Sequence, residues 1–196
     1  MQANVFEGGF ADPVFTSQAV FRAVMDAFAR PGTIHDLGDV ASAPAPIQPA
    51  AAAILLTLAD FDTPVWFEAA DSTEAEQWLA FHTGAVAVPD ATEASFAVLN
   101  DMSSLDSWGR FAVGTAEYPD RSATLVLPVV SLEGGRELTL RGPGIEKTTA
   151  IAPRELPESF VEAIQANVVL YPLGFDVVLV CGTKALALPR TTRIEV

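Results

Sequence analysis

The stretch Val177-Val178-Leu179-Val180-Cys181-Gly182-Thr183-Lys184-Ala185-Leu186-Ala187-Leu188-Pro189 decides the fold of this chain. Val177 to Cys181 is apolar without alternation and rich in β-branched residues, which predicts a short strand buried on both faces. Gly182-Thr183-Lys184 predicts a tight reversal, because glycine accepts the positive φ that such a turn needs. Ala185 to Leu188 fits the partner strand, and pairing should end at Pro189, which cannot donate to a central ladder.

The polar segment Arg190-Thr191-Thr192-Arg193 follows this hairpin directly. We expect the rigid core to hold its arginines and hydroxyls at one rim of the sheet, where α/β folds bind ligands. Arg141 ends another predicted strand, and Arg30 follows the first helix, so both are expected to meet Arg190 in one cleft. Guanidinium groups bind phosphate with paired donors, so the cluster predicts an anion site. Surface ion pairing is the alternative for these arginines.

Arg30 and His82 each have a structural alternative as well. Arg22, Asp26 and Arg30 share one helical face, where an i,i+4 ion-pair ladder is as consistent with the spacing as ligand binding. His82 falls in the last turn of a predicted helix, where its charge complements the helix dipole. Acid–base chemistry is the other function open to His82.

Composition narrows the function further. The 196 residues fit a single domain, with residues 1–13 as an N-terminal arm. The net charge of −14 argues against binding nucleic acid or anionic lipid. The lone Cys181 predicts a reducing compartment, and the N-terminus lacks a secretory pattern. The longest apolar run, Ala50 to Ala59, is too short to span a bilayer, so a cytoplasmic protein is expected.

Helical and strand patterns alternate along the chain, which predicts an α/β fold with a mixed sheet and helices on its faces. Helices are expected from a cap at Thr16 or Ser17 to Arg30, from Pro49 to about Leu58, from Thr73 to Gly84 with a capping box at Glu76, and from Pro157 to Asn167. Strands are expected over 33–37, 65–67, 95–99, 124–130 and 137–141. The turn Glu133-Gly134-Gly135-Arg136 should join the last two as a second hairpin.

Familiar catalytic signatures are absent from the sequence. His35 and His82 are far apart and have no cysteine partner, so no metal site is expected. Asp60 and Asp62 could share Mg²⁺, although turn duty is the more common use of such aspartates. Gly142-Pro143-Gly144-Ile145 lacks the third glycine of a dinucleotide motif, which leaves a plain turn or a backbone cradle for phosphate.

Several motifs in order resemble those of one known family. They are 21–33 with Arg30-Pro31-Gly32-Thr33, 55–58 leading to Asp62-Thr63-Pro64-Val65-Trp66, Phe81-His82-Thr83-Gly84-Ala85, Gly114-Thr115-Ala116-Glu117-Tyr118-Pro119, Ala123-Thr124-Leu125, Leu140-Arg141-Gly142-Pro143-Gly144-Ile145, 171–176, and Leu188-Pro189-Arg190-Thr191-Thr192. Their order and spacing are similar to PhnH, the H subunit of the carbon–phosphorus lyase system of bacterial phosphonate utilisation. The resemblance covers nearly the whole chain.

The resemblance implies a three-layer α/β/α fold, similar to the large domain of pyridoxal-phosphate-dependent transferases but without the cofactor. The residues agree, because a Schiff base needs a buried lysine and only Lys147 and Lys184, both in polar surroundings, are present. The resemblance also implies a homodimer that joins the other core subunits and, with them, attaches a phosphonate to the ribose of ATP in place of adenine. A single cysteine cannot hold the iron–sulfur cluster of the later cleavage step.

Two molecular functions therefore stay open. In the first, the subunit contributes an arginine-lined pocket for phosphonate or nucleotide, with Arg141, Arg190, Thr191, Thr192, Arg30 and His82 as the candidate residues. In the second, it is a non-catalytic scaffold that stabilises the complex. A free-standing enzyme is disfavoured, since no nucleophile–base pair is evident in the sequence.

Overall fold

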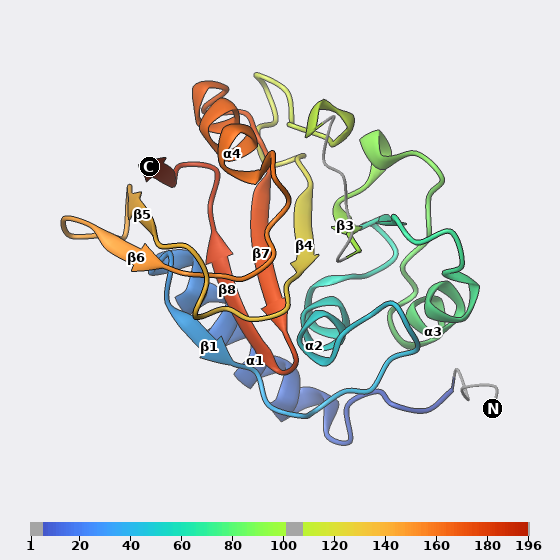
Figure 1. Cartoon of the computed structure of the whole chain (residues 1–196). Coiled ribbons are helices and arrows are strands. Elements are labelled where there is room, and N and C mark those ends of the chain that lie inside the picture. Colours follow the sequence, from blue (N-terminus) through green and yellow to red (C-terminus); the bar gives the residue numbers. More distant parts are fainter. Residues whose placement is uncertain (1–5, 101–107, 196) are drawn as a thin grey trace.

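The computed structural model describes residues 6–100 and 108–195 (Figure 1). Its helices are α1 (Pro13–Ala29), α2 (Pro49–Leu58), α3 (Thr73–Thr83) and α4 (Phe160–Val169), with short 3-10 turns η1 (Ala91–Glu93) and η2 (Trp108–Arg110). Its strands are β1 (Ile34–Asp36), β2 (Val65–Phe67), β3 (Phe96–Val98), β4 (Thr124–Pro128), β5 (Leu138–Arg141), β6 (Thr149–Ile151), β7 (Asp176–Cys181), β8 (Lys184–Leu188) and β9 (Arg193–Glu195).

The main sheet is mixed, as the sequence predicts. Its strand order is β1-β8-β7-β4-β3-β2. Strands β2, β3, β4 and β7 run parallel, whereas β8 pairs antiparallel with both β7 and β1. Parallel neighbours need long crossovers, and the connection from β4 to β7 carries β5, β6 and α4.

The β7–β8 hairpin is confirmed at the centre of this sheet. Its register runs from Val177 opposite Leu188 to Cys181 opposite Lys184, and Gly182 turns the chain at φ 58°. Alternate side chains enter different cores: Val178 and Val180 pack with the helices α1 to α3, whereas Val177 and Leu179 pack on the other face. Burying each such side chain contributes about 1.5–3 kcal/mol, which explains the continuous apolar run.

The two faces of the main sheet are covered differently (Figure 1). Helices α1, α2 and α3 share one hydrophobic core with one face. On the other face, α4 shares its layer with a small sheet of order β6-β5-β9. The sequence gives the α/β class correctly, but it does not reveal β6, β9 or the small sheet.

The expected second hairpin is wrong. Strand β5 pairs with β6 and β9 and belongs to a different sheet from β4. The turn before β5 packs against the chain that follows β6: the Gly135 amide donates to the Ala152 carbonyl at 2.7 Å. A Cβ on Gly135 would stand 2.0 Å from the Pro153 oxygen, so the close approach itself selects glycine.

The starts of α1 and α4 differ from those expected from the sequence, whereas α3 starts at Thr73 as expected but with a different cap. Helix α1 is capped by Asp12, whose carboxylate accepts from the Phe15 amide at 3.3 Å, instead of Thr16 or Ser17, and Pro13 occupies the first turn. The capping box of α3 is wrong, because the Ser72 hydroxyl donates to the Glu76 carboxylate at 2.6 Å and caps no backbone group. Helix α4 begins at Phe160, after a turn that starts at Pro157.

The sequence predicts the C-terminal ends of α2 and α3 more accurately than it predicts the helix starts. Gly84 ends α3 in the left-handed region at φ 77°, and α2 runs over Pro49–Leu58 as expected. Within residues 6–100 and 108–195, no helix combines the length and apolarity needed to cross a membrane. The likeness to pyridoxal-phosphate-dependent transferases stays a prediction.

Candidate anion-binding site

The small sheet places two arginines side by side. Strands β5 and β9 are antiparallel, with Leu140 opposite Ile194 and Arg141 opposite Arg193. Because side chains alternate along a strand, Leu140 and Ile194 point into the core and both arginines are exposed on the outer face. The short patterns Leu-Thr-Leu-Arg and Arg-Ile-Glu are therefore amphipathic strands that meet on tertiary folding.

The charges of this arginine pair are only partly compensated. Arg141 Nε lies 2.9 Å from a carboxylate oxygen of Glu195, and both side chains are 54% exposed. Arg193 has no ion pair or side-chain hydrogen bond within the part of the chain that the structure describes. Like charges directly opposite each other on a sheet are destabilising. An anion between the two guanidinium groups would remove that repulsion.

A cavity of about 480 Å³ adjoins the pair. Beside Arg141, Arg193 and Glu195, its lining consists of Gly142, Pro143, Val168, Tyr171 and Thr191. Guanidinium and hydroxyl donors thus lie next to an aromatic and aliphatic wall. Such a wall suits the non-ionic part of a phosphate or phosphonate ester.

Close backbone packing forms one wall of this cavity. A Cβ on Gly142 would stand 2.9 Å from the Thr191 carbonyl oxygen, so the loop after β5 lies directly against the turn before β9. That turn is closed by the Thr192 amide, which donates to the Pro189 carbonyl at 2.8 Å. Thr192 itself is fully buried, and its hydroxyl has no partner among the described residues. Of the two adjacent threonines, only Thr191 lines the cavity.

Arg190 lies outside this cavity. Its Nη2 lies 2.5 Å from Asp176 Oδ2, and the two side chains are 15% and 19% exposed. Arg190 also donates to the Pro119 carbonyl at 2.8 Å and to the Ser122 hydroxyl at 2.5 Å. Its guanidinium is therefore occupied by this part of the protein and joins the start of β7 to the 119–122 loop.

Arg30 lies in a neighbouring cavity of about 410 Å³, whose lining includes Thr33 and Lys147. Arg30 pairs with Asp26 at 2.6 Å, one turn back on α1, which is the expected i,i+4 bond. The prediction that Arg30, Arg141 and Arg190 line one cleft is wrong. Their positions are set by three different pairings that sequence spacing does not reveal.

His82 is further removed, in the last turn of α3. Its Nε2 lies 3.3 Å from the Glu7 carbonyl oxygen, and its ring packs against Trp78 and Phe81. It lines a separate cavity with Phe6 and Gly9. The structure thus ties His82 to the segment before α1, and it does not bring His82 to the arginines.

No metal-binding group is evident in the described residues. Over 6–100 and 108–195, no cluster of three or more His, Cys, Asp or Glu side chains occurs. Asp60 accepts from the Asp62 amide at 2.9 Å and from the Thr63 hydroxyl at 3.1 Å, which are the bonds of a turn.

Comparison with known proteins decides the family. The family model described as "Bacterial phosphonate metabolism protein (PhnH)" matches residues 8–195. The chain belongs to the PhnH family. A PhnH relative from Rhizobium meliloti (strain 1021), "Alpha-D-ribose 1-methylphosphonate 5-triphosphate synthase subunit PhnH", is 48% identical over 99% of this chain and 98% of its own length. A "Putative C-P lyase subunit protein HtxG" from Stutzerimonas stutzeri is 29% identical over 91% of this chain and 85% of its own length.

The recognition from ordered motifs is thereby confirmed. Within this PhnH-family chain, the sequence indicates Arg141 and Thr191 as residues of one site. It does not indicate that Tyr171 and Lys147 line cavities. The alternation of polar and apolar residues in 138–141 and 193–195 is the signal that could have placed Arg193 beside Arg141. That signal is weak because both strands are very short.

Proposed function

We propose that this chain is a subunit of a synthase that, together with partner subunits, forms ribose 1-phosphonate 5-triphosphate from ATP and a phosphonate. The observation that carries the proposal is the 48% identity, over nearly both full lengths, to a relative named as the PhnH subunit of such a synthase. The HtxG relative, named as a C-P lyase subunit, supports the same pathway.

We further propose that the Arg141–Arg193 cavity is where the subunit contacts an anionic substrate. Two guanidinium groups and the Thr191 hydroxyl supply donors, and Tyr171 with Pro143 supplies a wall for the sugar, base or alkyl part. The chain carries a net charge of −14, which repels anions at long range. Screening confines that repulsion to about 8 Å at physiological salt, so close guanidinium contacts decide binding inside the cavity.

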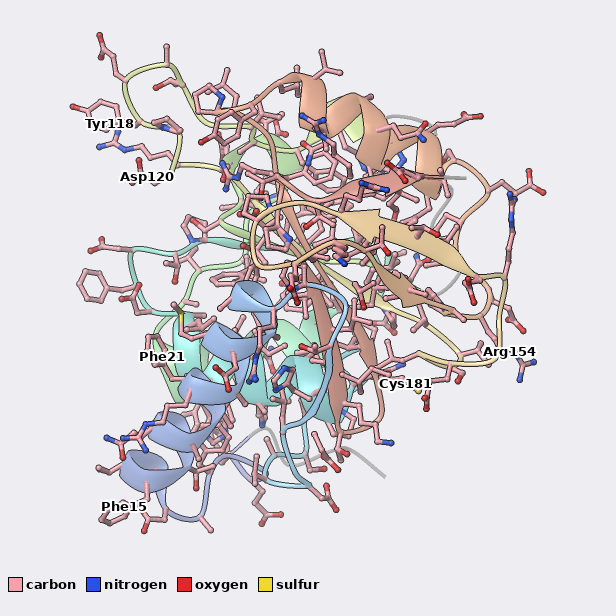
Figure 2. All side chains as sticks on the ribbon, turned by 90° about the vertical axis from the view of Figure 1, so that its left-hand side faces the viewer. Phe15, Phe21, Tyr118, Asp120, Arg154 and Cys181 are labelled. Atoms are coloured by element: carbon pink, nitrogen blue, oxygen red, sulfur yellow. The ribbon has the colours of Figure 1, made fainter. Side chains whose placement is uncertain are left out.

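The need for partner subunits fits the exposed surface of α1. Val14, Phe15, Phe21 and Met25 are 75%, 72%, 47% and 51% exposed, and Figure 2 shows Phe15 and Phe21 along this helix. Large apolar side chains gathered on one helix are typical of a protein–protein contact. We propose that this surface serves contacts with other core subunits or with a second copy in a homodimer, and that the isolated chain does not turn over substrate.

The scaffold function is the second candidate, and one observation favours it. Arg30, Arg141 and Arg190 each bond to a nearby carboxylate, of Asp26, Glu195 and Asp176, respectively. A subunit whose arginines are all satisfied internally would stabilise the complex without binding a ligand. Arg193, which has no such carboxylate within the described residues, distinguishes the two candidates.

The test combines co-purification with calorimetry and growth. The chain is expressed with the neighbouring subunits of its system, and the purified complex is titrated with ATP and methylphosphonate. Arg193→Gln should leave the complex intact, weaken binding at least about tenfold and abolish growth on methylphosphonate in a deletion strain. Arg154→Gln is the matched control, since Arg154 is also exposed, as Figure 2 shows, and does not line the Arg141–Arg193 cavity.

The outcomes separate the candidates. Failure to co-purify with any partner subunit would overturn the subunit assignment. Unchanged binding and growth of Arg193→Gln in an intact complex would remove the ligand site and leave the scaffold function.

A further inference from the structure

One loop separates two cavities that both carry cations. Gly142 and Pro143 line the cavity of Arg141 and Arg193, whereas the next residues, Gly144 to Thr149, line the cavity of Arg30. The loop is closed on itself by the Ile145 amide, which donates to the Gly142 carbonyl at 3.1 Å. The two cavities are thus the two sides of a single short turn.

The loop is held between α1 and the turn before β9. A Cβ on Gly144 would stand 2.2 Å from the Ala29 carbonyl oxygen, and one on Gly142 would stand 2.9 Å from that of Thr191. Both glycines have positive φ, 83° and 148°, which other residues rarely adopt. This packing fixes the loop on both sides, so the distance between the two cavities is set by the fold.

The second cavity has the donors of an anion site. Its charged lining residues are the cations Arg30 and Lys147 and the carboxylate Glu146, and its hydroxyls come from Thr33, Thr148 and Thr149. Arg30 is held by Asp26. Lys147, by contrast, has no ion pair or side-chain hydrogen bond within the described ranges 6–100 and 108–195.

The Glu146 carboxylate and the carbonyl end of α1 both oppose an anion here. Part of that end is already satisfied: the Arg30 carbonyl accepts from the Thr33 amide at 3.2 Å and from the Thr33 hydroxyl at 2.7 Å. The donors that remain for an anion are the Lys147 ammonium, the Arg30 guanidinium and the hydroxyls of the lining threonines.

We propose that the cavity around Arg30, Thr33 and Lys147 is a second anion subsite, so that this chain holds two phosphate- or phosphonate-type groups at once, one on each side of the 142–147 loop. The inference deepens the proposed function, because a synthase that joins ATP to a phosphonate must bring two anionic substrates together. It rests on that function for this expectation and for the choice of probes.

The experiment measures stoichiometry on the purified full chain and on the complex. Phosphorus NMR or calorimetric titration with methylphosphonate should give two equivalents for the unmodified protein. Lys147→Gln should weaken one of them about tenfold or more, and Arg193→Gln should weaken the other. Saturation with ATP distinguishes the subsites, since ATP should displace one equivalent and leave the second in place.

Lys184→Gln is the control variant, because Lys184 is an exposed lysine at the β7–β8 turn and lines neither cavity. It should bind both equivalents unchanged. Circular dichroism and the thermal midpoint verify that each variant folds.

A single equivalent in both the lone chain and the complex, or two equivalents that Lys147→Gln leaves unaltered, would overturn the second subsite. Neither result contradicts the proposed assignment as a synthase subunit. That assignment fails when the chain does not associate with its partner subunits.

Discussion

Arg190 and Asp176 are joined through both the backbone and the side chain of the arginine. The Arg190 amide donates to Asp176 Oδ1 at 2.8 Å, Nε to the same oxygen at 3.3 Å, and Nη2 to Oδ2 at 2.5 Å. Asp176 starts β7, and Arg190 follows β8 on the same hairpin. The pair therefore closes the open end of the hairpin and leads directly into Thr191 and Arg193 of the candidate site.

Arg190→Gln should destabilise the protein by about 2–3 kcal/mol, because it leaves a mostly buried carboxylate without its counter-charge. Urea unfolding at neutral pH measures the change. Arg141→Gln is the control: its pair with Glu195 is half exposed, and its loss should cost no more than about 1 kcal/mol. Equal losses from both variants would contradict the structural role given to Arg190.

Arg193→Gln should have the opposite effect on stability. Removal of one of two like charges opposite each other on β5 and β9 should raise the free energy of unfolding by about 0.2–1 kcal/mol. Anion affinity should fall in the same variant. A stabilised variant that binds ligand more weakly is the signature of a binding residue, whereas a structural residue would lower both. Unfolding measured in the absence of added anions tests this sign.

Gly144→Ala should destabilise the fold by more than about 2 kcal/mol, because the clash of the new Cβ with the Ala29 carbonyl adds to the backbone cost of a φ of 83°. Gly182→Ala is the matched control. Its φ of 58° is also positive, but nothing lies within 4 Å of the new Cβ, so only the backbone cost of about 1–2 kcal/mol applies. The thermal midpoint of Gly144→Ala should therefore lie below that of Gly182→Ala. A smaller loss at Gly144 than at Gly182 would contradict the close packing of the loop.

Asp36 should contribute to stability in a pH-dependent way. The Gly38 amide, which donates to the carboxylate, holds the pKa of Asp36 below its ordinary value, and the Thr183 hydroxyl and Lys184 act in the same direction. A lowered pKa in the folded state stabilises above the unfolded-state pKa, and this contribution is lost as pH falls through the folded-state pKa. Asp36→Asn should therefore be less stable than the unmodified protein at pH 6, and the difference should shrink below about pH 4. Urea unfolding at both pH values measures it; a difference independent of pH would contradict the assignment.

Much of the helical and central-strand pattern can be read from local sequence. Pro49 marks a helix start because its ring fixes φ, and Gly84 marks a helix end because glycine accepts a positive φ, whatever the rest of the chain does. The Asp12 cap is missed, since Thr16 and Ser17 offer equally suitable oxygens nearby. The pairing of β5 is missed for a different reason: the turn at Gly134-Gly135 permits a hairpin, and only contact with Ala152 and Pro153 decides against it.

The candidate site shows the same division. Arg141 and Thr191 are recognisable as site residues from the sequence, and their binding role stays a prediction. Arg30 and Arg190 pair with Asp26 and Asp176, respectively, and neither arginine lines the cavity of Arg141. Lys147 and Tyr171 enter the two cavities only through folding.

The sequence alone determined the family, the α/β class and the buried β7–β8 hairpin, because each depends on residue order or on the apolar run of a single segment. Tertiary structure alone decided which arginines are free, since a guanidinium pairs with whichever carboxylate the fold brings within reach. Arg193 stands opposite Arg141 only because two short strands, distant in the chain, meet in one register.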